Sequence, residues 1–394
     1  MTSSSSASLT SSTITPSSGV VQYSRGEAKI LCTAYGFSSG FTDSQIDYAI
    51  SNYDVIIMHW YDYSSVRDSI LKLKRQKPDL VILVYISAPS ASPTIDSYIN
   101  WTEVNMHENW FLHDVDGNRL QIIWESGWYC MDIANPEWRQ YLGDWCYETL
   151  FQKCPEIDGI FVDNAWPTFW KDGWRVPREK LPPEYGTTWY ADMKGLLAYL
   201  KSRIGTKLLI PNTSDNADFV DVSDGKMAEG FVHYPWWDVN YFSPFDYPNQ
   251  NATYPEQMAK FKNVLDRGKY FLAIDGSLNI QSLEDAKRVF YYSFCSFLLL
   301  ANEKASFKFE WKTFEDTYGL LPLTYNAGLL GSATGDYYAL ADSLARDFEN
   351  GRVIVNYTPY NTTINLEGNF KTLDGAVLNQ ITLPPHTGVM LYKI

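Results

Sequence analysis

The chain has 394 residues, 45% of them hydrophobic, which is enough for one large domain and a small one. Its formal net charge is −14 and its sequence contains no basic run of the kind that phosphate binding requires, which argues against a nucleic-acid partner. Aromatic residues make up 16% of the chain, with 14 Trp and 28 Tyr, so we expect some of these rings to line a ligand surface.

The N-terminal region has an unusual composition. Residues 2–18 are almost all Ser and Thr, which bury too little apolar surface to fold, so we expect residues 1–27 to be disordered. No apolar stretch of a signal peptide is present, and the Ser/Thr-rich start favours a sequence that begins after a cleaved signal. We therefore expect the protein to be secreted or attached to the cell surface. Five N-x-[ST] sequons agree weakly with export: Asn100, Asn212, Asn251, Asn356 and Asn361.

Eight short apolar runs recur along the chain, at residues 29–37, 53–60, 79–87, 158–164, 207–212, 226–234, 269–276 and 305–311. Segments with helical spacing lie between them, at residues 43–52, 64–76, 135–152 and 190–204. This alternation predicts a (β/α)8 TIM barrel over residues 28–335. An open doubly wound sheet is the alternative, but it would normally carry a glycine-rich phosphate turn, and the sequence has neither common signature.

The longest apolar run, residues 289–302, is shorter than the roughly 20 residues needed to span a bilayer, so we expect a buried helix and no membrane span. From Asp336 the helical period gives way to short alternating segments separated by Asn-Gly, Asp-Gly and Pro turns. These segments predict a small antiparallel β-sandwich over residues 336–394.

Five cysteines are present, without a C-x-x-C pair or a zinc-binding spacing. Cys32 and Cys295 lie in apolar runs and are expected to be inert core thiols. Cys130, Cys146 and Cys154 are the pool from which one disulfide would be drawn. The sequence indicates no metal and no cofactor.

Acidic residues lie at or near the ends of four predicted strands: Asp163, Glu229, Asp275 and Glu310. In a TIM barrel the active site lies at the C-terminal ends of the strands, so these four should converge. Two carboxyl groups across one cleft can divide the roles of acid and nucleophile or base, which is the minimal equipment for breaking a glycosidic bond. A loop cap or a salt bridge is the structural alternative for each acid alone.

Rings and polar side chains follow these acids closely, and flat rings suit the apolar faces of sugars. The residues expected to bind substrate, besides Asp275 and Glu310, are His59, Trp60, Asn164, Trp166, Trp170, Asn212, His233, Trp236 and Trp237. Core packing is the alternative for each ring, and a structural hydrogen bond is the alternative for each His.

Two other chemistries are disfavoured. The G-x-S-x-G match at Ser38 follows a predicted strand, but the next helix is expected only near Asp43, whereas a nucleophile elbow needs a helix at once. The sequence also lacks H-E-x-x-H and paired His on its first strand, which argues against a metal-dependent amidohydrolase.

The string "WYCMDIANPEWRQYL" followed by "DGIFVDNAW" resembles a pattern of α-amylase and α-galactosidase type glycoside hydrolases. With "AEGF" and "RDFENGRVIVNYT", the chain from about residue 28 to 394 most resembles hypothetical glycosyl hydrolase family 15. The resemblance implies a nucleophile or base at Asp163 and a general acid at Glu229. Amylases carry their acid on the fifth strand, where this chain has "KLLIPN" with Asn212, which argues against amylase specificity.

These observations predict a glycoside hydrolase that acts on a carbohydrate, with either retention or inversion at the anomeric carbon. The alternative is a catalytically inactive barrel that binds glycans or acts at a cell surface with the same rings. Sugar, linkage and oligomeric state are left open.

Overall fold

The computed structural model describes residues 25–35, 38–87, 89–93, 99–123, 127–169, 173, 175–213, 219–233, 253–277, 279–280, 282–311 and 320–394. The predicted N-terminal segment, apart from residues 25–27, lies outside this range, as do Trp170, Trp236 and Trp237.

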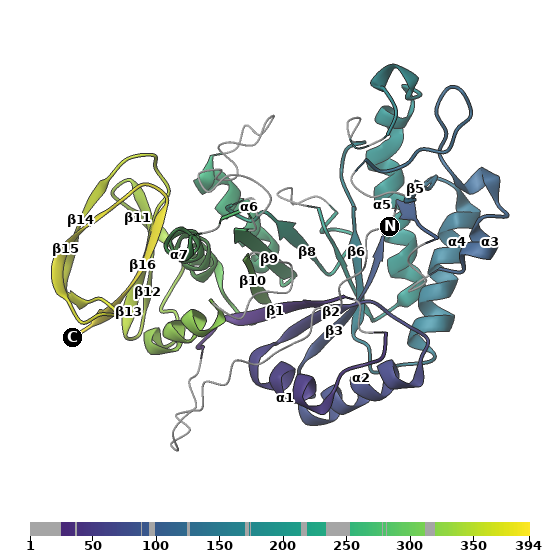
Figure 1. Ribbon diagram of the computed structural model, residues 1–394. Coiled ribbons are helices and arrows are strands. Elements are labelled where there is room, and N and C mark those ends of the chain that lie inside the picture. Colours follow the sequence, from purple (N-terminus) through teal and green to yellow (C-terminus); the bar gives the residue numbers. More distant parts are fainter. Residues whose placement is uncertain are drawn as a thin grey trace.

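Eight parallel strands form the barrel at the centre of the molecule (Figure 1). They are β1 (Lys29–Ala34), β2 (Val55–Met58), β3 (Val81–Ser87), β6 (Gly159–Asp163), β7 (Leu208–Pro211), β8 (Gly225–Glu229), β9 (Tyr270–Ser277) and β10 (Ala305–Trp311). Their order is β7-β6-β3-β2-β1-β10-β9-β8, and a parallel bridge between Asn212 and Met227 brings the two edge strands together. Each predicted apolar run overlaps one of these strands, and the predicted barrel is confirmed.

Helices cover the outside of the barrel. They are α1 (Asp43–Asn52), α2 (Ser64–Gln76), α4 (Pro136–Asp144) with its π-helical continuation η2 (Trp145–Phe151), α5 (Tyr185–Ile204), α6 (Tyr254–Asp266) and α7 (Leu283–Leu300). The first starts at a capping box, in which the Thr42 side chain accepts from the backbone of Gln45 and the Gln45 side chain accepts from the backbone of Thr42. The helix α7 contains most of the longest apolar run and is buried as predicted. In the part of the chain that the structure describes, no helix is both long and apolar enough to cross a bilayer.

An excursion of about 70 residues separates β3 from β6 and lies beside the barrel (Figure 1). It contains β4 (Ser90–Ala91), α3 (Trp101–Val104), η1 (Glu108–Trp110) and β5 (Tyr129–Cys130), and it ends in α4. The "Asn-Pro" of the family pattern begins that helix: Asn135 Oδ1 accepts from the backbone of Glu137 at 2.9 Å, and Pro136 needs no donor partner there. The Asn-Pro pattern therefore marks the start of α4, the helix that leads toward β6. The short helices η4 (Arg178–Lys180) and η5 (Leu321–Leu330) lie in later connections.

The C-terminal strands form one six-stranded antiparallel sheet that curves beside α7 (Figure 1). The strands are β11 (Tyr338–Leu340), β12 (Ser343–Phe348), β13 (Gly351–Asn356), β14 (Thr362–Lys371), β15 (Val377–Leu383) and β16 (Thr387–Lys393). Alternate residues serve two cores: Val353 and Val355 pack in the core that includes α7, whereas Ile354 packs in a second core within the curved sheet. The appended β-domain is therefore anchored to the barrel through α7.

The expected disulfide is wrong, because all five cysteines are free thiols. Cys130, Cys146 and Cys154 are each fully buried, and burial raises the pKa of the Cys154 thiol to about 12. Two of the sequons are also inaccessible in the fold. Asn212 is 5% exposed, and the buried amide of Asn356 donates to the carbonyls of three residues.

Candidate active site

The mouth of the barrel brings two acidic residues to one amide. Asp163 ends β6 and Glu229 ends β8, and Asn212 directly follows β7, the strand between them. The Asn212 Nδ2 atom donates to Asp163 Oδ1 at 3.0 Å and to Glu229 Oε2 at 2.8 Å. The backbone of Asn212 holds it in place, because its N–H donates to the Val162 carbonyl at 2.9 Å.

The shared amide limits the separation of the two carboxyl groups. Since both oxygens bond one nitrogen, at 3.0 Å and 2.8 Å, they can be no more than 5.8 Å apart. Retaining glycosidases place their carboxyl groups about 5 to 5.5 Å apart, and inverting enzymes about 6.5 to 9.5 Å apart. The closest oxygens of Asp163 and Glu229 therefore lie below the inverting range.

Three aromatic side chains from the region of β1, β2 and β3 form a cluster beside Asp163. The Tyr85 hydroxyl donates to Asp163 Oδ2 at 2.8 Å. Tyr35 stacks on His59 with centroids 4.8 Å apart and meets Tyr85 edge-on at 5.4 Å. Burial lowers the pKa of His59 to about 4, so this imidazole is neutral near pH 7. Of these three residues, only His59 was predicted to bind substrate. Tyr35 and Tyr85 lie inside predicted apolar runs, so from the sequence they look like core residues.

Burial raises the pKa of both acids, but their surroundings differ. For Glu229 the pKa rises to about 7, through burial first and then the negative charges of Asp163 and Glu310. Burial also raises the pKa of Asp163, but hydrogen bonds from Asn212, Tyr85 and the Asn164 backbone oppose the rise. Near neutral pH the arrangement can hold a proton on Glu229 while Asp163 stays ionised.

Glu310 lies beside this pair. Its Oε1 accepts from Lys308 Nζ at 2.6 Å, and the same ammonium donates to the hydroxyl of Thr33. Lys308 and Glu310 are 2% and 1% exposed, so this is a buried ion pair inside the barrel. Glu310 therefore lies inside the barrel beside the two acids, and its role in binding substrate stays a prediction.

Asp275 lies on the outer face of β9, away from the pair of acids at the mouth, and its role in binding substrate stays a prediction. Its neighbours in β9 face opposite ways: Ile274 packs in the core that contains the barrel interior, and Ala273 packs in the core that contains α6 and α7. Asp275 shares the outward face with Ala273. It is fully buried and accepts from the backbone N–H groups of Val232 and His233 at 3.1 and 3.0 Å.

His233 is held by the same structure. It is fully buried, and its Nδ1 lies 2.7 Å from the Gly276 carbonyl oxygen, which makes this nitrogen the donor. This bond gives the ring a structural role, and its contact with substrate stays a prediction. Together, Asp275 and His233 fix the turn that follows Glu229.

Trp60 is also placed away from the mouth. It is 2% exposed and belongs to the large hydrophobic core, so its ring is not available to stack on a sugar. Trp166 is partly exposed after β6, and its carbonyl accepts from Trp189 Nε1 at 3.0 Å. Asn164 has a φ of 56°, a left-handed conformation that Asn tolerates, and its amide lies 3.4 Å from the Ser87 hydroxyl. The chain therefore turns sharply straight after Asp163.

Ser38 is not a nucleophile elbow. It is exposed, and α1 begins at Asp43, five residues later, as expected. A nucleophile elbow needs a helix directly after its serine, and α1 begins too late for that.

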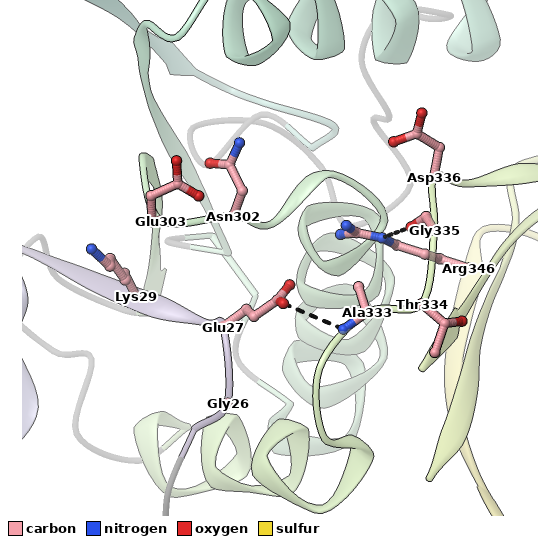
Figure 2. Close-up of a pocket in the computed structure, with 10 residues that line it drawn as sticks. All are labelled: Gly26, Glu27, Lys29, Asn302, Glu303, Ala333, Thr334, Gly335, Asp336 and Arg346. Carbon is pink, nitrogen blue, oxygen red and sulfur yellow. Dashed lines mark hydrogen bonds between the residues drawn. The ribbon is translucent and has the colours of Figure 1, made fainter. Parts of the chain in front are cut away.

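A hollow of about 740 Å³ lies elsewhere, at the opposite end of the barrel (Figure 2). Its lining comes from the chain before β1, the turn between α7 and β10, and the start of the β-domain; it includes Glu27, Lys29, Glu303, Asp336 and Arg346. The Arg346 guanidinium donates to the carbonyls of Leu298, Ala301 and Gly335, so it joins α7 to the β-domain. This end of a TIM barrel serves stability rather than catalysis, and the candidate site remains at the mouth.

Residues 74–352 match hypothetical glycosyl hydrolase family 15, which is more than half of the chain. The chain belongs to this family. The description of the family as glycosyl hydrolases supports hydrolysis of glycosidic bonds. A search of curated proteins found no match to this chain.

Solved structures agree with the fold. A family 39 glycoside hydrolase from Bacteroides cellulosilyticus has a TM-score of 0.52 and 9% identity, over 94% of this chain and 82% of that one. The protein Ttha1563 from Thermus thermophilus has a TM-score of 0.50 and 12% identity, over 93% and 99%. The glycoside hydrolase domain of PelA from Pseudomonas aeruginosa has a TM-score of 0.46 and 12% identity, over 73% and 96%. At such low identities the first two show a shared fold only.

Proposed function

We propose that this protein is a secreted, retaining glycoside hydrolase that uses Asp163 as nucleophile and Glu229 as general acid and base. The observation that carries the proposal is the Asn212 amide, which donates to both carboxyl groups and so keeps the two bonded oxygens within 5.8 Å of each other. Membership in the glycosyl hydrolase family supports the reaction class. The substrate is an oligosaccharide or polysaccharide. Secretion rests on the Ser/Thr-rich start of the chain and is tested by assaying culture medium for the protein.

In the first step Asp163 attacks the anomeric carbon and forms an ester bond to it. The bond to the leaving oxygen breaks, and that oxygen takes the proton of Glu229. In the second step a water molecule gives its proton to Glu229 and attacks the same carbon, which releases the Asp163 carboxylate. Two displacements at one carbon retain its configuration.

The surroundings of the two acids support this division of roles. Tyr85 and Asn212 both donate to Asp163, which favours its ionised form, whereas Glu229 has a pKa of about 7 and keeps its proton at mildly acidic pH. The Asn212 bond also orients Glu229, because Oε2 accepts from the amide and Oε1 is left to carry the proton. Once Asp163 becomes an ester its charge is gone, which lowers the pKa of Glu229 but leaves it able to act as base in the second step.

A glycan panel with reducing-sugar detection tests the activity, and proton NMR of the first product tests the mechanism. We expect at least one glycan to be cleaved and the product to have the anomeric configuration of the substrate. An inverted product would contradict the nucleophilic role of Asp163. Binding without any cleavage would favour the inactive, glycan-binding barrel.

A further inference from the structure

One carboxylate oxygen in the barrel has no hydrogen-bond partner within the described part of the chain. This atom is Oε2 of Glu310, a residue that is 1% exposed. The other oxygen, Oε1, accepts from Lys308. Buried polar atoms are nearly always paired, since desolvating one without a partner is costly. A buried charged acceptor left open beside a reaction centre is suited to a donor that a ligand brings.

The alternation along β10 places Glu310 on the inner face. Phe307 and Phe309 meet Phe290 of α7 edge-on, at centroid distances of 6.3 and 5.4 Å, so they point outward. Lys308 and Glu310 are the intervening residues and point inward. The reach of Lys308 to the Thr33 hydroxyl on β1 agrees with this direction.

The inner position brings Glu310 close to the two proposed catalytic acids. Its charge acts on Glu229, and the charges of Glu310, Glu229 and Asp163 all act on the Tyr35 hydroxyl. On the strand between Glu229 and Glu310, the residue in register with Glu310 is Gly276, which carries no side chain. Space beside Glu310 is therefore not taken by a neighbour on β9.

We propose that Glu310 Oε2 accepts a hydrogen bond from one free hydroxyl of the sugar ring that binds between Asp163 and Glu229, with Lys308 holding the carboxylate in place. This makes the Lys308–Glu310 pair a specificity site, and the inference rests on the proposed function. The sugar must carry an unsubstituted hydroxyl at the matching position. A ring with an anionic group there is rejected, because like charges would meet in a buried site.

The test is a double-perturbation cycle, in which the substitution Glu310→Gln is combined with the removal of one hydroxyl group at a time from the substrate. The probes are the 4-nitrophenyl glycoside that the wild-type enzyme hydrolyses and its monodeoxy versions. We expect Glu310→Gln to lower kcat/KM on the parent glycoside by about 10- to 100-fold, the effect of losing a hydrogen bond to a charged group. On one monodeoxy glycoside the wild-type enzyme should already be that much slower, and Glu310→Gln should change kcat/KM by less than about threefold. The matched control is Glu303→Gln, an exposed glutamate at the opposite end of the barrel, which should change nothing.

A purely structural role for Glu310 would lower kcat/KM by the same factor on every glycoside, and that result overturns the inference. Equal rates of the wild-type enzyme on all monodeoxy glycosides overturn it too. Should Glu310→Gln fail to fold, Lys308→Gln with Glu310→Gln replaces the ion pair by a neutral pair and enters the same cycle. A wild-type enzyme that cleaves no glycoside or glycan refutes the proposed function, and this inference with it. A cleaving enzyme without the cycle effect refutes this inference alone.

Discussion

The Tyr85 hydroxyl donates to Oδ2 of Asp163 at 2.8 Å, across the neighbouring strands β3 and β6. The tyrosine lies two residues before Ser87, the residue in register with Asp163, so both side chains are on the inner face of the barrel. A donor to a carboxylate favours its ionised form, which a nucleophile requires. Tyr85 therefore positions the Asp163 carboxylate and favours its ionised form.

Replacing Tyr85 by Phe removes this donor and keeps the ring. We expect the pKa of Asp163 to rise, so that the acidic limb of the kcat/KM profile moves to higher pH. Turnover should fall by about 10- to 100-fold, as expected for one hydrogen bond to a charged group. Tyr360→Phe, at a tyrosine that is 65% exposed in the β-domain, is the control. An unchanged acidic limb in Tyr85→Phe would show that the bond does not tune Asp163.

Asn212 is the second positioning residue, and two substitutions separate its effects. Asn212→Ala removes the donor to both acids, so we expect turnover to fall by at least about tenfold. Asn212→Asp adds a further carboxylate to the site, which should raise the pKa of Glu229 further and move the alkaline limb of the profile to higher pH. The pH profiles of both variants give the measurement. Identical profiles for the two would argue that Asn212 acts only through its backbone bridge to Met227.

The barrel strands could be predicted from the sequence because each is an apolar run bounded by turn residues. The boundaries of the helix at residues 43–52 could also be predicted, because a capping residue precedes a segment with regular helical spacing of its apolar residues. The disulfide could not be judged, since thiol separation depends on packing that a sequence does not display.

The site was predicted in part. Asp163, Glu229 and Glu310 stand at or near the ends of strands and on the inner face. Asp275 also stands near a strand end, but it is one residue out of phase with the inward-facing residues and points to α7. A shift of one residue along a strand decides whether a side chain points into the barrel or toward the outer helices. When a strand is apolar on both faces, its sequence does not show which residues point inward.

Asp275→Asn should therefore affect stability more than catalysis. The aspartate accepts from the backbone of Val232 and His233, so we expect a loss of about 1 to 3 kcal/mol in the free energy of unfolding. Turnover of the folded variant should stay within about tenfold of wild type, because the side chain faces away from the mouth. Thermal denaturation and kinetics measure the two effects, with exposed Asp266→Asn as control. A loss of turnover as large as that of Asp163→Asn would return Asp275 to the site.

Glu229 should make the protein less stable as pH rises. Its pKa is about 7 in the folded chain and near 4.5 when unfolded, so between these values the folded state keeps a proton that the unfolded state has lost. Stability therefore falls as pH increases through this window. Glu229→Gln removes the contribution of this residue, and we expect the variant to be more stable than wild type at pH 8, by about 1 to 3 kcal/mol, and similar to it near pH 4.5. Urea denaturation at both values tests this, and a variant less stable than wild type at pH 8 would contradict the raised pKa.

The turnover number of Asp163→Asn tests the central claim most directly, on whichever glycan or glycoside the wild-type enzyme cleaves. The substitution keeps the volume and removes the nucleophile, so we expect a fall of about 1000-fold or more at a melting temperature close to that of wild type. Glu229→Gln should fall comparably, and the double variant little further, because the two groups act in one step. Turnover of folded Asp163→Asn within about tenfold of wild type would contradict the account.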